Sequence, residues 1–112
     1  PRLENLVAGA LLKHCDFLRD TAGRRMELRY FRDKEKHEVD FVVLENKRPC
    51  WLIEVKAGDD QLAPALPYLH KKYPEARALQ LVLHLARAKT VGGCEIRPLF
   101  PWLVDALLKA GS

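Results

Sequence analysis

The chain of 112 residues lacks a long hydrophobic run. Its purely apolar stretches are only a few residues long, well short of the roughly 20 that a membrane-spanning helix needs. The first residues, 1–5, include Arg2 and Glu4 and do not resemble a signal peptide. We therefore expect a cytoplasmic domain without a membrane segment.

Cysteine is scarce and irregularly placed. Cys15, Cys50 and Cys94 are far apart, are odd in number and form no CxxC pair, which excludes a zinc ribbon. This usage is typical of reduced thiols in the cytoplasm. The chain also begins without Met, so we expect it to be a domain cut from a longer protein.

The composition suits one small domain spanning residues 1–112. Hydrophobic residues make up 48% of the chain, enough for a core, and the length leaves no room for a second domain. The formal net charge of +4 permits contact with nucleic acid or an acidic partner but does not require it.

The hydrophobic pattern changes from helical to extended near residue 20. Apolar residues at three- and four-residue steps predict an amphipathic helix over 2–19, with a buried stripe of Leu3, Leu6, Val7, Ala10, Leu11, Phe17 and Leu18. A period of two then predicts strands over 26–32, 38–44 and 50–56. Polar turns at 33–36 and 45–49 join these strands into an antiparallel meander.

The second half predicts a crossover. Asp59 and Asp60 offer an N-cap to a helix that Pro64 and Pro67 confine to a late start and Pro74 ends. The apolar segment 77–85 is typical of a buried strand parallel to the one before the helix. Residues 91–93 are expected to form a loop, 94–99 a short edge strand and 101–110 a final helix. The fold class is therefore α/β (mixed α+β), a core of order α-β-β-β-α-β with a mixed sheet flanked by helices, plus a C-terminal helix.

Acidic residues and one lysine converge on two neighbouring strands. Glu54 and Lys56 are two residues apart, so their side chains share a face of the strand. A hairpin centred on Lys47 puts Asp40 directly opposite Glu54 on that face. Two opposed carboxylates repel unless water or a cation separates them, and Mg²⁺ prefers such oxygen ligands. Glu4 lies at the rim of the predicted helix stripe, from which it can reach the same site.

These residues resemble a known nuclease pattern. Glu4 on the first helix, Asp40 in EVD, and Glu54 and Lys56 in IEVK are similar to the PD-(D/E)XK superfamily, which has the restriction-endonuclease-like fold, although Val39 replaces the proline of the name. The segments RLENLVA, LRYFRD, HEVDFVVLE and WLIEVKAGD more closely resemble domain of unknown function 4143, found at the C-terminus of prokaryotic AAA+ ATPases. No GxxxxGK[ST] occurs, so the ATPase module is absent from this chain.

The resemblance implies a Mg²⁺- or Mn²⁺-dependent phosphodiester hydrolase acting on nucleic acid, with DNA the expected substrate. Asp40 and Glu54 would hold the metal with the backbone carbonyl of Val55, Glu4 would assist directly or through water, and Lys56 would serve the nucleophile. The implied partners are the N-terminal AAA+ ATPase domain of the parent protein and a second copy in a homodimer. The alternative is a catalytically silent nuclease-fold domain that acts as a recognition or regulatory module of that ATPase. A third possibility is an interaction domain that binds no nucleic acid.

Structural alternatives stand beside several of these assignments. Glu38 shares the face of Asp40 and is a second choice as ligand, and Glu4 can simply favour the first helical turn. Gln80 is a weak candidate for positioning water, and burial with a hydrogen-bond partner suits it better. None of the histidines has the spacing of a metal site. His70, Lys71, Lys72 and Arg77 form a basic cluster, which is a solvated face by default and a phosphate-binding strip if nucleic acid passes the site.

Overall fold

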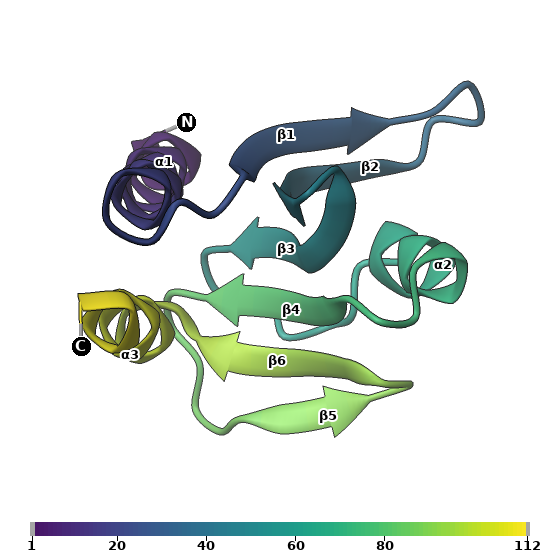
Figure 1. The fold of residues 1–112 in the computed structure, drawn as a ribbon. Helices are drawn as coiled ribbons and strands as arrows, with labels where there is room; N and C mark the ends of the chain where they lie inside the picture. Colours follow the sequence, from purple (N-terminus) through teal and green to yellow (C-terminus); the bar gives the residue numbers. More distant parts are fainter. Residues whose placement is uncertain (1, 112) are drawn as a thin grey trace.

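The computed structural model describes residues 2–111, with side chains as far as Leu108. Three helices and six strands follow one another along the chain (Figure 1). They are α1 (Arg2–Ala22), β1 (Met26–Arg32), β2 (Glu38–Glu45), β3 (Arg48–Lys56), α2 (Ala65–Lys72), β4 (Arg77–Val82), β5 (Lys89–Val91), β6 (Cys94–Pro98) and α3 (Leu99–Gly111). No helix in this described part of the chain is long and apolar enough to cross a membrane.

All six strands belong to one mixed sheet of order β1-β2-β3-β4-β6-β5. The first three strands form the antiparallel meander expected from the period of two. β4 then pairs parallel to β3, because α2 connects the two strands and returns the chain to the starting end of the sheet. β6 pairs parallel to β4. The mixed α+β class and the buried parallel strand are therefore confirmed.

Helices cover both faces of this sheet (Figure 1). On one face, Val7 and Leu11 of α1 and Leu99 and Leu103 of α3 pack on the inward side chains of β3 and β4. On the other face, α2 packs on β2, β3, β4 and β6 through a second cluster that contains Leu66 and Leu69. The alternation of side chains along β3 sends Ile53 and Val55 to the α1/α3 face, and it sends Leu52, Glu54 and Lys56 to the α2 face.

The buried stripe of α1 differs from the predicted one. Leu6 and Phe17 are 51% and 40% exposed, whereas the buried residues are Val7, Leu11, His14, Cys15 and Leu18. The stripe is therefore rotated about the helix axis toward Glu4, which lies one and two heptads before Leu11 and Leu18. Glu4 is half-buried, which agrees with its predicted position at the rim of the stripe.

The second half departs from the sequence prediction at two points. Asp59 and Asp60 do not cap α2, which begins after Pro64 without a side-chain cap. Asp59 instead accepts a hydrogen bond from the backbone N–H of Gln61 in the preceding loop. β6 is not an edge strand either, because the short, fully exposed strand β5 pairs with it and forms the edge.

The β2–β3 hairpin contains a bulge that sets the register of the site. Asn46 and Lys47 both have positive φ, as a tight two-residue turn requires, and Glu45 pairs with Arg48 across it. The register then shifts by one residue at Cys50, so that Phe41 pairs with Ile53. Continued by one residue, this register puts Asp40 opposite Glu54. The predicted opposition is thus correct, but the bulge produces it rather than a turn centred on Lys47.

Candidate functional site

Two backbone hydrogen bonds lock Asp40 and Glu54 together. The backbone N–H of Asp40 donates to Glu54 Oε1 over 3.0 Å, and the N–H of Val55 donates to Asp40 Oδ2 over 2.8 Å. Here the two strands are joined through carboxylates rather than through the usual ladder of backbone hydrogen bonds. One oxygen of each carboxylate, Asp40 Oδ1 and Glu54 Oε2, is left out of these two bonds.

The pair has an unusual electrostatic balance. Glu54 is only 8% exposed. Burial, the charge of Asp40 and a hydrogen bond between the two carboxyl groups raise the pKa of Glu54 to about 7. Lys56 opposes this shift, with its Nζ atom 3.8 Å from Glu54 Oε2. Two acids and one ammonium group thus share one face of the sheet, as the spacing predicts.

Glu4 reaches the same region from α1. A cleft of about 210 Å³ is lined by Glu4, Asp40, Glu38, Tyr30 and Arg32, together with Phe31 and Val39. Glu38 forms an ion pair with Arg32 across the β1–β2 ladder. This pairing makes Glu38 less available as a cation ligand than Asp40. The cleft therefore lies between the start of α1, the end of β1 and the start of β2.

The donor set suits a hard divalent cation. Carboxylate oxygens of Asp40 and Glu54 lie together in a half-buried setting, and the carboxylate of Glu4 lines the adjoining cleft. Oxygen ligands of this kind are those that Mg²⁺ and Mn²⁺ favour. A cation between Asp40 and Glu54 would relieve the repulsion that raises the pKa of Glu54.

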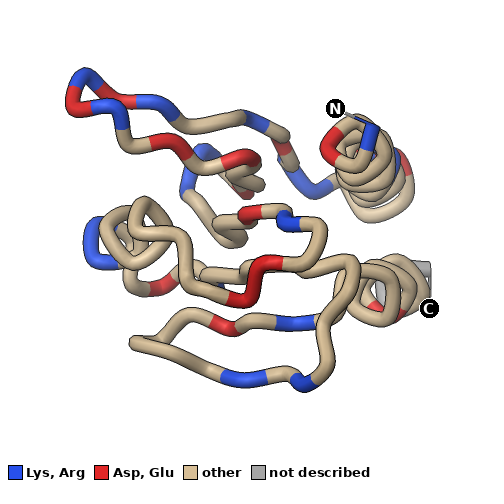
Figure 2. The backbone as a smooth tube through the Cα atoms, turned by 180° about the vertical axis from the view of Figure 1, so that it is seen from behind, with Lys and Arg blue, Asp and Glu red and all other residues tan. Residues whose placement is uncertain are grey.

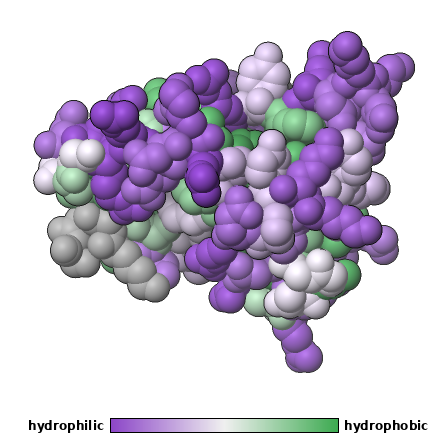
Figure 3. All heavy atoms as spheres, turned by 45° about the vertical axis from the view of Figure 1, so that its right-hand side comes forward, coloured by the Kyte–Doolittle hydropathy of each residue, from purple (hydrophilic) through white to green (hydrophobic). Residues whose placement is uncertain are grey.

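The predicted basic cluster does not form one surface. His70, Lys71 and Lys72 lie in the last turn of α2, where Lys72 Nζ stands 4.8 Å from the centre of the Tyr68 ring. Arg77 instead lines a cleft on the α1/α3 side and forms two hydrogen bonds with Glu95, at 2.9 and 3.0 Å. Hydrophilic side chains cover most of the face seen in Figure 3. Of the four residues, only the three on α2 can act together on that side of the sheet.

A second acidic group lies at the tip of the β1–β2 hairpin, where charges of both signs alternate (Figure 2). Ligand atoms of Asp33, Glu35 and His37 lie within 4.8 Å of one another. Asp33 Oδ1 already accepts hydrogen bonds from the backbone N–H groups of Glu35 and His37. The His37 ring stacks on Tyr68 of α2, with ring centres 3.7 Å apart. These contacts give the group a structural role, because they hold the tip of the β1–β2 hairpin against α2.

Gln80 has the structural role that its burial favours. It is fully buried on β4 in register with Glu54. Its Oε1 accepts a hydrogen bond from the Ala63 N–H over 2.9 Å, and its Nε2 donates to the Gln61 carbonyl over 2.7 Å. Gln80 thus holds the loop between β3 and α2 against the sheet, beside the carboxylate pair.

Tyr30 is a candidate that the sequence analysis missed. It lines the cleft with Glu4 and Asp40 and is 78% exposed. The β1–β2 register shifts between Arg29 and Phe31, where Tyr30 alone lies opposite two residues of β2, Asp40 and Phe41, so the bulge is on β2. Bulges re-aim side chains beside functional sites. The available signal was an aromatic residue between two arginines in LRYFR.

The fold and site together define a mixed α+β domain with an acidic cleft. Residues 2–99 match the sequence profile of a family described as a domain of unknown function, DUF4143, and the chain belongs to that family. Neither the curated proteins nor the solved structures contain a match to this chain.

Proposed function

We propose that this domain is a divalent-cation-dependent nuclease with a PD-(D/E)XK-type site that hydrolyses phosphodiester bonds, with DNA as the expected substrate. The observation that carries the proposal is the opposition of Asp40 and Glu54 on adjacent strands, with the Lys56 ammonium 3.8 Å from Glu54. Asp40 of this Asp-Glu-Lys set lines an open cleft together with Glu4.

Each residue has a role that follows from its position. Asp40 and Glu54 would hold Mg²⁺ or Mn²⁺, with the carbonyl of Val55 as a further ligand and Glu4 acting directly or through water. The cation would supply charge stabilisation to the phosphate and a more acidic bound water. The half-exposed ammonium of Lys56 is free to orient the attacking water and to offset the charge that develops on the phosphate oxygens.

The cleft also offers contacts for the substrate. Tyr30 presents an exposed ring on which a base can stack, and Arg32 lies beside it. Lys71 and Lys72 add positive charge on α2, on the same side of the sheet as Glu54. These groups support contact with the nucleic acid backbone by charge rather than by sequence.

A second candidate is a catalytically silent domain that serves as a recognition or regulatory module of an AAA+ ATPase. The observation in its favour is that the carboxylates are satisfied without a cation. Asp40 and Glu54 each accept a backbone hydrogen bond, and a pKa of about 7 lets Glu54 hold a proton near neutral pH. An acid pair of this kind can persist as a structural clasp between β2 and β3.

Cleavage of a substrate panel distinguishes the two candidates. The panel contains duplex, single-stranded and branched DNA with RNA beside it, each incubated with Mg²⁺ or Mn²⁺ and with a chelator. A nuclease cuts at least one substrate, stops with the chelator, and loses activity in Glu54→Gln but not in Glu75→Gln, an exposed acid in the turn after α2. Binding without cutting across the panel would establish the silent candidate instead.

A further inference from the structure

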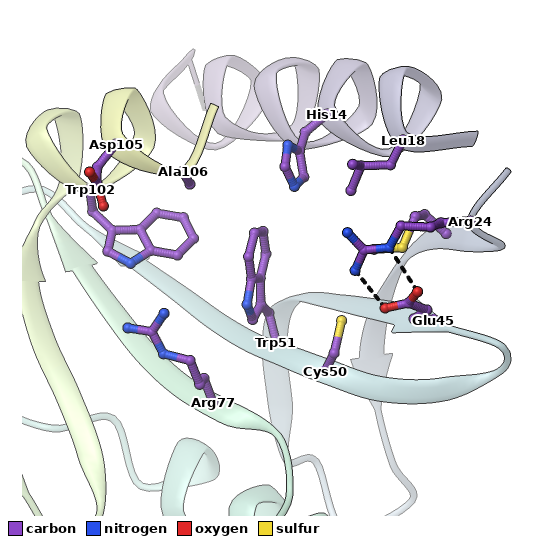
Figure 4. A pocket seen from close by; sticks show the side chains of 11 residues that line it. His14, Leu18, Arg24, Glu45, Cys50, Trp51, Arg77, Trp102, Asp105 and Ala106 are labelled. Atoms are coloured by element: carbon purple, nitrogen blue, oxygen red, sulfur yellow. Dashed lines mark hydrogen bonds and ion pairs between the residues drawn. The ribbon is translucent and has the colours of Figure 1, made fainter. Parts of the chain in front are cut away.

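A second cleft lies on the opposite side of the sheet from the carboxylate pair. It has a volume of about 300 Å³ and opens between α1, α3 and the strands (Figure 4). Trp51 of β3 stands in its centre, with Trp102 of α3 on one side and His14 of α1 above. The volume is that of roughly ten water molecules and lies at the lower end of the range of small-molecule sites.

The walls of this cleft are aromatic. The His14 ring stacks on Trp51 with ring centres 5.3 Å apart and planes 15° apart. Trp102 meets Trp51 edge to face at 5.1 Å. Flat rings preferentially contact such surfaces, because a planar ligand adds a further stacked or edge-on partner at low cost in conformational entropy.

His14 is the unsatisfied polar group of the cleft. It is 6% exposed, and its Nδ1 has no hydrogen-bond partner among the residues that the structure describes. Burial and the charge of Arg24 lower the pKa of its imidazole, so the ring is neutral near pH 7. A neutral imidazole has one donor and one acceptor nitrogen, which suits a neutral polar partner rather than an ion.

The cleft is lined by equal numbers of positively and negatively charged side chains. The lining contains two guanidinium groups, of Arg24 and Arg77, and two carboxylates, of Glu45 and Asp105 (Figure 4). Arg24 donates two hydrogen bonds to Glu45, at 2.7 and 2.8 Å, and Arg77 donates two to Glu95. Each guanidinium retains further N–H donors, since it has five in all. A ligand in this cleft therefore meets both donors and acceptors, and the formal charges of the lining side chains sum to zero.

We propose that this cleft binds an uncharged, flat heterocycle of the nucleobase class, with its ring against Trp51 and Trp102 and its polar edges toward the arginine and carboxylate groups. Arginine pairs well with the acceptor edge of a purine, and carboxylates accept from exocyclic amino groups. The ligand comes either as a free nucleoside or as a base of single-stranded nucleic acid. The site does not depend on Asp40, Glu54 or any cation.

The two tryptophans of the chain both line this cleft, which gives a direct measurement. Each indole N–H gives one signal in a ¹H–¹⁵N correlation spectrum. We expect guanosine and adenosine to shift both signals saturably, with dissociation constants below about 1 mM. Ribose, which lacks the ring, gives no shift, and benzoate, which carries a charge, binds at least tenfold more weakly.

Two variants test the contacts. Trp51→Leu removes the central ring and weakens nucleoside binding at least tenfold, read from the Trp102 signal, with the backbone amides of the same spectrum reporting the fold. His14→Phe keeps the stacked ring but removes its nitrogens, and it weakens binding severalfold even if Trp51→Leu fails to fold. Glu35→Gln, at the exposed tip of the β1–β2 hairpin and outside this lining, binds as the wild type does.

A short single-stranded oligonucleotide, added with a chelator, separates the two sources of the ligand. The same indole shifts with the oligonucleotide identify a base within nucleic acid, and shifts with nucleosides alone identify a free heterocycle. The proposal is overturned if neither indole signal shifts saturably with any of these probes up to about 10 mM. It is also overturned if benzoate or ribose binds as tightly as the nucleosides do.

Discussion

At the scale of single residues, Lys56 is the site residue whose substitution should affect cleavage most and the stability of the fold least. Its side chain is 36% exposed, and its ion pair with Glu54 spans 3.8 Å, so the pair contributes less than about 1 kcal/mol to folding. Glu54 and Asp40, by contrast, are joined to the backbone of the opposite strand. A substitution at Lys56 therefore tests catalysis without dismantling the site.

Lys56→Ala is expected to reduce cleavage by a factor of about 100 or more while the melting temperature changes little. Cation binding is retained, because an ammonium group is not a ligand. Cleavage is measured on the most sensitive substrate of the panel and cation binding by calorimetry. Lys34→Ala, at the exposed hairpin tip, serves as the matched lysine control. Undiminished cleavage by Lys56→Ala would remove this residue from the mechanism.

The raised pKa of Glu54 predicts a pH dependence of stability. Its folded-state pKa of about 7 exceeds the ordinary value of 4.5, so the folded state holds the proton more tightly than the unfolded chain. This contribution is complete below pH 4.5 and is lost as the pH rises through about 7, at most about 3 kcal/mol in the free energy of unfolding.

Denaturant unfolding from pH 5 to 8 measures this effect as the difference between wild type and Glu54→Gln. The subtraction removes the opposite contribution of His14, whose lowered pKa makes stability rise with pH. We expect the variant to gain stability relative to wild type as the pH increases. A difference that does not change with pH would mean that Glu54 titrates normally.

At the scale of helices and strands, regular patterns were readable and local irregularities were not. The bounds of β1 follow from alternation alone, and the late start of α2 follows from Pro64 and Pro67. The edge strand β5 was missed because three exposed residues, 89–91, give no alternation of buried and exposed positions. The bulges at Asp40 and Phe41 of β2 and at Cys50 of β3 were missed because a register shift depends on the partner strand.

In the candidate site, too, some features could be predicted from the sequence and others could not. Spacing alone was sufficient to bring Glu54 and Lys56 to one face, because period two is a property of the strand itself. The position of Asp40 opposite Glu54 depended on the bulge at Cys50, which the spacing does not reveal. The placement of Glu4 depended on the rotation of α1, which the packing of His14 and Cys15 determines. Exposed apolar residues such as Phe17 shifted the predicted stripe away from its true position.

The basic residues of α2 provide a prediction at this scale. Lys71 is exposed, so Lys71→Ala is expected to weaken nucleic acid binding about equally for all sequences. The slope of log affinity against log salt falls by about one, measured by fluorescence anisotropy from 50 to 200 mM salt. Arg77→Ala is the contrasting variant, because it breaks the Glu95 pair on the other side of the sheet. It changes stability while the salt slope stays as in wild type.

At the scale of the whole molecule, a cation at the carboxylate pair couples to folding. A ligand that binds only the folded state raises the melting temperature, and the increase grows with the logarithm of the ligand concentration above its dissociation constant. Mg²⁺ or Mn²⁺ is therefore expected to stabilise the wild type, and Glu54→Gln is expected to lose most of that gain. Differential scanning fluorimetry with and without each cation measures it. An equal gain in both proteins would place the cation elsewhere on the surface.

The bulge at Cys50 determines whether opposed residues of the β2–β3 hairpin are separated by an odd or an even number of positions. Across a two-residue turn, opposed residues are always separated by an odd number of positions, as Glu45 and Arg48 are, whereas Asp40 and Glu54 are separated by an even number. The unpaired residue Cys50 accounts for this difference, because it adds one position to β3 without a partner on β2. Deleting Cys50 should therefore set Asp40 opposite Ile53 and abolish cation-dependent stabilisation in the melting assay. Deleting Cys50 while adding a glycine to the turn restores the even separation of Asp40 and Glu54 and should recover the cation-dependent stabilisation. This hairpin should therefore tolerate two compensating changes in length but not a single one.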